Sequence, residues 1–343
     1  MSTDQKYMQR ALGLAKLGGA YTYPNPLVGA VIVHNDTIIG EGYHQVCGEA
    51  HAEVNAVNSV QDKSLLAEST IYVTLEPCSH YGKTPPCADL LVHHNFKRVV
   101  IATVDPFAQV NGAGISRLKN AGIEVETGIL EEEARLQNRR FFTFHQKKRP
   151  YIVLKWAESQ DGFMDNADPS RTVSWITGPE SKVLVHQQRS EEASILVGWK
   201  TIQNDNPSLT VREISGKDPL RIIIDPHLKA APDSLIYTDG KPGVILNEVK
   251  EEKAGAIHYY KVDSLSPTSV CEALYQLGQL SVYIEGGAYT LQSFIDSGLW
   301  DEAYQFIGPV RFGKGTIAPI IKKAPDTSQM INQDQLFFYK HQK

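Results

Sequence analysis

Strand-like and helix-like segments alternate through the first 145 residues, and this alternation constrains the fold more than any other feature. Strands are expected at 28–33, 37–42, 70–75, 98–104 and 123–127, and helices at 7–15, 51–60, 87–94, 114–121 and 130–145. Asn35 and Asp36 favour a tight turn between the first two strands. Strands that alternate with helices are typical of a mostly parallel sheet with helices on both faces. We therefore expect a three-layer α/β/α domain.

A basic segment at residues 147–150 predicts the end of this domain, because Pro150 disfavours continuation of the preceding helix. Further strands are expected from 151 and at 194–198, 221–225, 243–246, 281–285 and 303–307, with helical patterns between several of them. The length of 343 residues suits about two domains of roughly 150 residues each. The predicted division is 1–147 and 148–343, with a second α/β domain.

The composition excludes several classes of protein. A net charge of −5 argues against broad electrostatic binding of nucleic acid. No run approaches the ~18 apolar residues of a membrane span, and the polar start resembles no signal peptide. Four cysteines are too few for a disulfide framework in a chain of this length. We expect a cytoplasmic enzyme without a membrane or nucleic-acid partner.

Two short segments carry the residues of a catalytic zinc site. The first is His51-Ala52-Glu53, and the second runs from Pro77-Cys78 to Cys87. A catalytic zinc needs three protein ligands and an open fourth position for water, which His51, Cys78 and Cys87 would leave. Zinc deaminases combine H-x-E with P-C-x-x-C, and the Glu carries protons instead of binding the metal. Here eight residues separate the cysteines. We predict zinc-dependent deamination, with Glu53 as the proton carrier.

Two other interpretations concern the cysteines. A closed structural zinc would need a fourth protein ligand, and none is evident, although Cys47 lies four residues before His51. Cys47 and Cys271 have no partner visible in the sequence, and we expect both to be buried free thiols.

Longer motifs resemble a known family. These are 24–33 (PNPLVGAVIV), 74–88 (TLEPCSHYGKTPPCA), 154–162 (LKWAESQDG), 175–178 (WITG), 205–212 (DNPSLTVR) and 285–287 (EGG). They resemble the bifunctional deaminase/reductase family of riboflavin biosynthesis over nearly the whole chain. The resemblance implies a cytidine-deaminase-like domain followed by a dihydrofolate-reductase-like domain that uses NADPH. The implied substrate is 2,5-diamino-6-ribosylamino-4(3H)-pyrimidinone 5′-phosphate. Its deamination and the reduction of its ribosyl group would yield 5-amino-6-ribitylaminouracil 5′-phosphate.

The resemblance also implies the residues of both sites. The deaminase substrate would meet Asn25, His44, His80, Lys83 and Asp105. The cofactor would meet Ala157, Trp175, Thr201, Asp205, Gly287, Ala288, Tyr289, Thr290, Leu291, Gln292 and Ser293. The reductase substrate would meet Lys155, Arg189, Leu209, Arg212 and Glu285. Arg189 and Arg212 suit a phosphate because a guanidinium group binds phosphate through two nitrogens.

The sequence departs from the family pattern at two positions. Val173 replaces a usual Ser, and Phe107 replaces a frequent Asn, so both expected substrate contacts are in doubt. The second half also lacks G-x-G-x-x-G. Its Gly286-Gly287 pair follows a predicted strand and precedes a predicted helix, where backbone N–H groups can hold a pyrophosphate.

Two alternatives remain at this point. One is a deaminase of nucleic-acid bases fused to another module, which the acidic composition and the long cysteine spacing disfavour. The other is that the second half is a regulatory nucleotide sensor, or that one half is catalytically inactive. The presence of Glu53 argues against an inactive deaminase, because a purely structural metal site does not need a proton carrier. The resemblance further implies a homo-oligomer, a dimer or tetramer.

Overall fold

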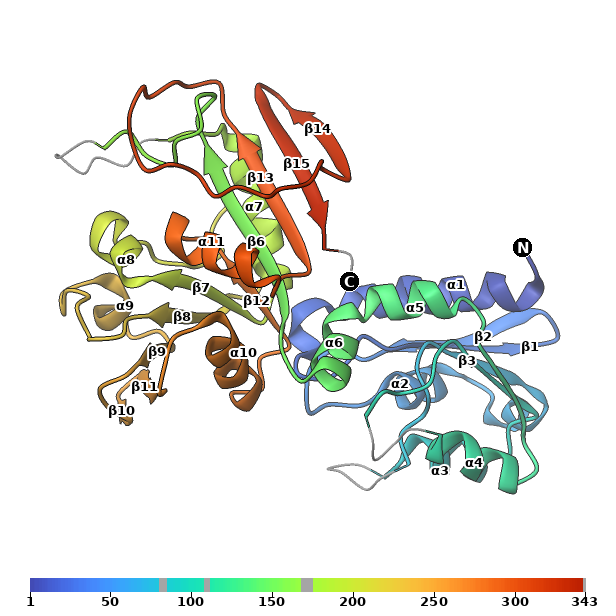
Figure 1. Cartoon of the computed structure of the whole chain (residues 1–343). Helices are drawn as coiled ribbons and strands as arrows, with labels where there is room; N and C mark the ends of the chain where they lie inside the picture. Colours follow the sequence, from blue (N-terminus) through green and yellow to red (C-terminus); the bar gives the residue numbers. More distant parts are fainter. Residues whose placement is uncertain (80–84, 108–111, 168–174, 342–343) are drawn as a thin grey trace. The chain divides into compact units, whose positions relative to one another are not determined.

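The computed structural model describes residues 1–79, 85–107, 112–167 and 175–341 (Figure 1). His80, Lys83 and Val173 lie outside these ranges. The chain divides into two units, Met1–Lys147 and Lys148–Lys343.

The first unit contains a five-stranded sheet with the order β2-β1-β3-β4-β5. Its strands are β1 (Gly29–His34), β2 (Thr37–Tyr43), β3 (Thr70–Val73), β4 (Arg98–Ile101) and β5 (Glu124–Thr127). The predicted hairpin turn is confirmed, with positive φ angles of 45° at Asn35 and 57° at Asp36. The pairs β3–β4 and β4–β5 are parallel, but β1 is antiparallel to both of its neighbours. The sheet is therefore mixed and not mostly parallel, because the hairpin reverses the chain at one edge.

Helices cover both faces of this sheet, as predicted. They are α1 (Thr3–Ala15), α2 (Ala52–Ser59), α3 (Cys87–His93), α4 (Ala113–Asn120), α5 (Glu131–Gln137) and α6 (Arg139–Lys147). Short 3-10 helices cover Lys16–Thr22 and Lys63–Glu68. Met8 of α1 packs with Val31 and Val100 on one face. Ala56 of α2 and Leu91 of α3 pack with Ile32 on the other. Alternate residues of β1 thus enter different cores.

The prediction of a single long helix at 130–145 is wrong, because Asn138 separates two helices, α5 and α6. The Asn138 Oδ1 atom accepts the Leu27 N–H at 2.8 Å, and its Nδ2 donates to the Leu27 carbonyl at 2.8 Å. Asn138 is buried, so these bonds satisfy its amide away from water. A side chain that binds a distant backbone segment has no local sequence signal.

The second unit contains a ten-stranded sheet with the order β10-β11-β9-β8-β7-β12-β6-β13-β15-β14. The strands are β6 (Tyr151–Glu158), β7 (Ser194–Gly198), β8 (Leu220–Ile224), β9 (Gly243–Asn247), β10 (Glu252–Ala254), β11 (Ile257–Lys261), β12 (Ser281–Ile284), β13 (Glu302–Ile307), β14 (Thr327–Ile331) and β15 (Asp334–Lys340). Its centre is parallel, and antiparallel hairpins form the two edges. The predicted strands are confirmed, whereas β10, β11, β14 and β15 were not predicted.

The helices of the second unit are α7 (Pro179–Glu191), α8 (Trp199–Asp205), α9 (Leu235–Thr238), α10 (Pro267–Gln276) and α11 (Ala288–Ser297). Leu274 of α10 and Phe294 of α11 pack on the face that includes Trp156. Ile202 of α8 packs on the opposite face with Val153. Because strand side chains alternate, Lys155 shares the face of Val153.

Candidate active sites

The starts of two helices and one loop bring the predicted metal ligands together. His51 is the N-cap residue of α2, Cys87 is the first residue of α3, and Cys78 lies in the loop between β3 and α3. Glu53 lies in the first turn of α2. Ligands of α/β sheets commonly bind at the carboxyl ends of strands, and a helix N-terminus favours thiolates.

The ligand atoms of His51, Cys78 and Cys87 lie within 4.8 Å of one another. The His51 Nδ1 atom is 3.3 Å from the Cys87 sulfur and 3.6 Å from the Cys78 sulfur. Tetrahedral bonding to zinc separates a nitrogen and a sulfur ligand by about 3.6 Å, given the usual bond lengths. The side chains therefore fit a zinc ion. Among the described residues, no fourth His, Cys, Asp or Glu joins this group, which suits a catalytic site.

The surroundings of the metal group shift the pKa values of Cys78 and Glu53. Hydrogen bonds from Cys87 and His51 lower the pKa of Cys78, which favours a metal-binding thiolate. Glu53 is buried, and burial together with the nearby Cys78 raises the pKa of Glu53 to about 7. A carboxyl group with this pKa exchanges protons readily near neutrality. Its position two residues after His51 places Glu53 beside the metal group without adding a fourth ligand.

His44 and Asn25 adjoin the metal group. The rings of His44 and His51 meet edge to face with centroids 5.5 Å apart. The His44 Nδ1 atom is 3.1 Å from the Ala50 carbonyl, and its Nε2 is 3.1 Å from the Asn25 amide nitrogen. The carbonyl accepts and the amide donates, so both contacts are satisfied by a neutral ring protonated at Nδ1. Burial lowers the pKa of His44 and so favours this form.

Glu76 organises the loops beside the site and was not among the residues predicted from the sequence. Its carboxylate accepts backbone N–H groups from Asp105 at 3.3 Å, Gly112 at 2.9 Å, Gly114 at 3.0 Å and Ile115 at 3.3 Å. Glu76 thus ties the segment that carries Cys78 to the loop of Asp105 and the start of α4. No sequence pattern pointed to Glu76, because its burial and its four backbone partners are visible only in the structure.

Asp105 is buried, and burial raises the pKa of Asp105 to about 6. Its carboxylate accepts the backbone N–H of Phe107 at 2.8 Å. The Phe107 ring packs edge to face on His145, with centroids 5.2 Å apart. Phe107 therefore has an aromatic partner in place of the amide contact that Asn would offer.

In the second unit, Lys155 lies within β6, and Glu285 directly follows the last residue of β12, the parallel neighbour of β6. Arg189 of α7 donates to both oxygens of Glu285, at 2.5 and 2.6 Å. Burial opposes ionisation of Glu285, but Arg189 holds the pKa of Glu285 at about 2. Burial also lowers the pKa of Lys155. Two nitrogens of Arg189 thus bind Glu285, and the phosphate contact predicted for Arg189 stays a prediction.

Residues predicted to bind the cofactor gather at two neighbouring strand-to-helix turns, β7 to α8 and β12 to α11. A Cβ atom at Gly286 would lie 3.0 Å from the Thr201 hydroxyl oxygen, and Gly287 has a φ of 69°. These glycines let the turns approach closely. Residues 288–293 form the first turns of α11, whose N–H groups suit a pyrophosphate.

The other predicted cofactor residues differ in exposure. Trp175 is 66% exposed and Tyr289 is 88% exposed, so both rings are available to a ligand. Ala157 is half-buried in β6, and Asp205 ends α8. Leu209 is only 2% exposed and packs in the core, so its side chain offers a ligand little surface.

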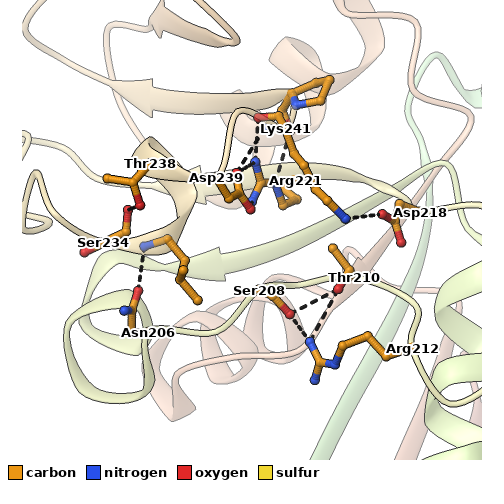
Figure 2. A network of polar contacts seen from close by, with 12 residues as sticks. Asn206, Ser208, Thr210, Arg212, Asp218, Arg221, Ser234, Thr238, Asp239 and Lys241 are labelled. Carbon is orange, nitrogen blue, oxygen red and sulfur yellow. Dashed lines mark hydrogen bonds and ion pairs between the residues drawn. The ribbon is translucent and has the colours of Figure 1, made fainter.

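Arg212 has an exposed side chain close to two hydroxyl groups (Figure 2). Its Nη1 contacts the Ser208 hydroxyl and lies 3.4 Å from the Thr210 hydroxyl. The Ser208 and Thr210 hydroxyl oxygens are 3.1 Å apart. One cation and two hydroxyl groups therefore converge at this edge of the second unit.

The expectation for the remaining cysteines is half correct. Cys271 is a buried free thiol as predicted, but Cys47 is exposed. Cys47 lies in a loop before α2, outside both hydrophobic cores of the unit. Within the parts of the chain described, no helix combines the length and hydrophobicity needed to cross a bilayer.

Comparison with known proteins finds a matching family for each unit. Residues 1–103 match the cytidine and deoxycytidylate deaminase zinc-binding region, and residues 150–333 match the RibD C-terminal domain. The riboflavin biosynthesis protein RibD of Aquifex aeolicus is 39% identical, with 98% of each chain covered. RibD of Bacillus amyloliquefaciens is 41% identical over 92% of this chain and 87% of its own.

A solved structure from Thermotoga maritima, described as a diaminohydroxyphosphoribosylaminopyrimidine deaminase/5-amino-6-(5-phosphoribosylamino)uracil reductase, has a TM-score of 0.88. It is 34% identical and covers 99% of both chains. Fold and site thus define a zinc-dependent deaminase domain and an NADPH-dependent reductase domain in one chain. The chain belongs to the RibD family of bifunctional riboflavin biosynthesis enzymes.

Proposed function

We propose that the first unit deaminates 2,5-diamino-6-ribosylamino-4(3H)-pyrimidinone 5′-phosphate and that the second reduces the ribosyl group of the product. The final product would be 5-amino-6-ribitylaminouracil 5′-phosphate. The observation that carries the proposal is the convergence of His51, Cys78 and Cys87 beside the buried Glu53. The names of the relatives and of the Thermotoga maritima structure support the choice of pathway and substrate class.

In the deaminase unit, His51, Cys78 and Cys87 would hold the zinc ion. When bound, zinc supplies a water molecule whose pKa is lowered to about 7. Glu53 would carry one proton of this water to a ring nitrogen and the second proton to the departing amine. Asn25, His44 and Asp105, with His80 and Lys83, would orient the pyrimidine and its phosphate. The partly buried His44–Asn25 contact supports a fixed orientation of the Asn25 amide.

In the reductase unit, NADPH would lie against the β7–α8 and β12–α11 turns. Its predicted contacts are Ala157, Trp175, Thr201, Asp205 and residues 287–293. Hydride transfer to the sugar C1′ carbon is the chemistry that NADPH supplies when bound. Lys155 and the Arg189–Glu285 pair would position the substrate, and Arg212 would meet its phosphate. Binding and orientation would carry most of the catalysis.

We further infer a cytoplasmic homo-oligomer, a dimer or tetramer. Free thiols and the metal-binding pair of cysteines suit a reducing compartment. The oligomeric state follows the expectation for the family, and sedimentation analysis of the purified chain would measure it.

Mass spectrometry of the pyrimidine substrate tests both steps. With zinc-loaded enzyme alone, one amine should be exchanged for oxygen. Addition of NADPH should then add two hydrogens to the product. Absence of the first step would refute the proposed deaminase substrate. Absence of the second alone would make the second unit a nucleotide sensor.

A further inference from the structure

Helix α7 holds the backbone beside Arg212 at two points. The His186 Nδ1 atom accepts the Arg212 backbone N–H at 3.0 Å. One turn later on the same helix, the Arg189 Nη1 atom donates to the Thr210 carbonyl at 3.1 Å. Between them, the Val211 N–H donates to the Asp218 carboxylate at 2.8 Å. Three successive residues are therefore fixed, and their backbone has little freedom to move.

The hydrogen bonds to the backbone of residues 210–212 determine where the polar side chains of this segment lie. Ser208, Thr210 and Arg212 contact one another through two hydroxyl groups and one guanidinium group (Figure 2). A guanidinium group flanked by hydroxyl donors suits the oxygens of a phosphate monoester. Because Arg212 is exposed, its long side chain would otherwise sample many conformations.

We propose that His186 determines the preference of the reductase unit for phosphorylated substrates, because its neutral ring fixes the backbone of Arg212 and thereby assembles Ser208, Thr210 and Arg212 into a phosphate subsite. This inference rests on the proposed function. His186 acts here as a positioning residue, since it holds the Arg212 backbone and Arg212 holds the phosphate.

The chemistry of His186 fits this role. A histidine ring accepts a hydrogen bond only from its unprotonated nitrogen, so the contact requires a neutral ring protonated at Nε2. His186 is 2% exposed. Burial, followed by the charges of Arg189 and Arg212, lowers the pKa of His186 to about 4. The ring therefore stays an acceptor at neutral pH and adds no positive charge beside Arg212.

The test uses the full-length zinc-loaded enzyme with NADPH and two forms of the deaminated substrate, with and without the 5′-phosphate. His186→Asn places an amide oxygen near the Nδ1 position and keeps an acceptor. His186→Gln is polar but reaches toward the Nε2 position, and His186→Leu has no acceptor. Gln187→Ala on the exposed neighbouring position of α7 is the matched control. NADPH affinity reports whether the second unit is folded in each variant.

We expect His186→Gln and His186→Leu to raise KM for the phosphorylated substrate about tenfold or more, because they leave the Arg212 N–H without its partner. KM for the unphosphorylated form and the kcat for both forms should stay within about threefold of wild type. His186→Asn and Gln187→Ala should resemble wild type with both forms, and all variants should deaminate normally.

Equal losses with both forms of the substrate would show a purely structural role and overturn the inference. So would an Asn variant as defective as the Leu variant, or a Leu variant with normal KM. Failure of the wild-type enzyme to reduce either form would instead refute the proposed function, and the inference would fall with it.

Discussion

Two residues at the first turn of α2, His51 and Glu53, hold different positions relative to the metal group. His51 precedes the helix as its N-cap and reaches both cysteine sulfurs, whereas Glu53 is buried beside them. Their spacing, with the two cysteines, made this group predictable from the sequence. Glu76 was not predictable, because its four backbone partners come from segments at least 29 residues away.

Glu53→Gln should keep the zinc ion and lose deamination. The amide retains the size of the side chain but does not carry a proton, so kcat should fall by about 10²- to 10⁴-fold. Metal content and deamination rate, measured on one preparation, check this. Reduction of substrate that is already deaminated should be unchanged. Loss of zinc from this variant would contradict the role assigned to Glu53.

At the scale of elements, the helices and central strands follow from hydrophobic patterns, and most of their positions were predicted. The β1–β2 turn was predictable because Asn35 and Asp36 tolerate positive φ angles. The edge strands were not, since β10 and most of β14 are exposed and show no apolar alternation. The break between α5 and α6 depends on Leu27, which is 111 residues from Asn138.

Asn138→Ala should destabilise the first unit by about 1–3 kcal/mol, because the N–H and carbonyl of Leu27 lose their partner. Urea denaturation of the full-length protein, followed by a signal from the first unit, measures the change. Asn120→Ala is the control, since Asn120 is exposed at the end of α4. Equal stability of the two variants would show that the contact with Leu27 contributes little.

The whole molecule consists of two units, and each has its own sheet, its own cores and its own group of candidate catalytic residues. The metal ligands all lie in the first unit, and the residues proposed to bind NADPH all lie in the second. The separation of the deaminase and reductase activities was predictable from the sequence, because each half of the chain carries its own motifs. The phosphate contact of Arg189 stays a prediction, and the sequence does not show that Glu285 binds two nitrogens of its guanidinium group.

Removal of zinc tests the central claim, that the two chemistries use separate sites in one chain. The same preparation is assayed for deamination and for reduction of substrate that is already deaminated, before chelation, after chelation and after zinc is restored. We predict that chelation abolishes deamination, that one zinc ion per chain restores it, and that reduction with NADPH is unchanged throughout. Deamination that persists without zinc, or reduction that is lost with it, would contradict this account.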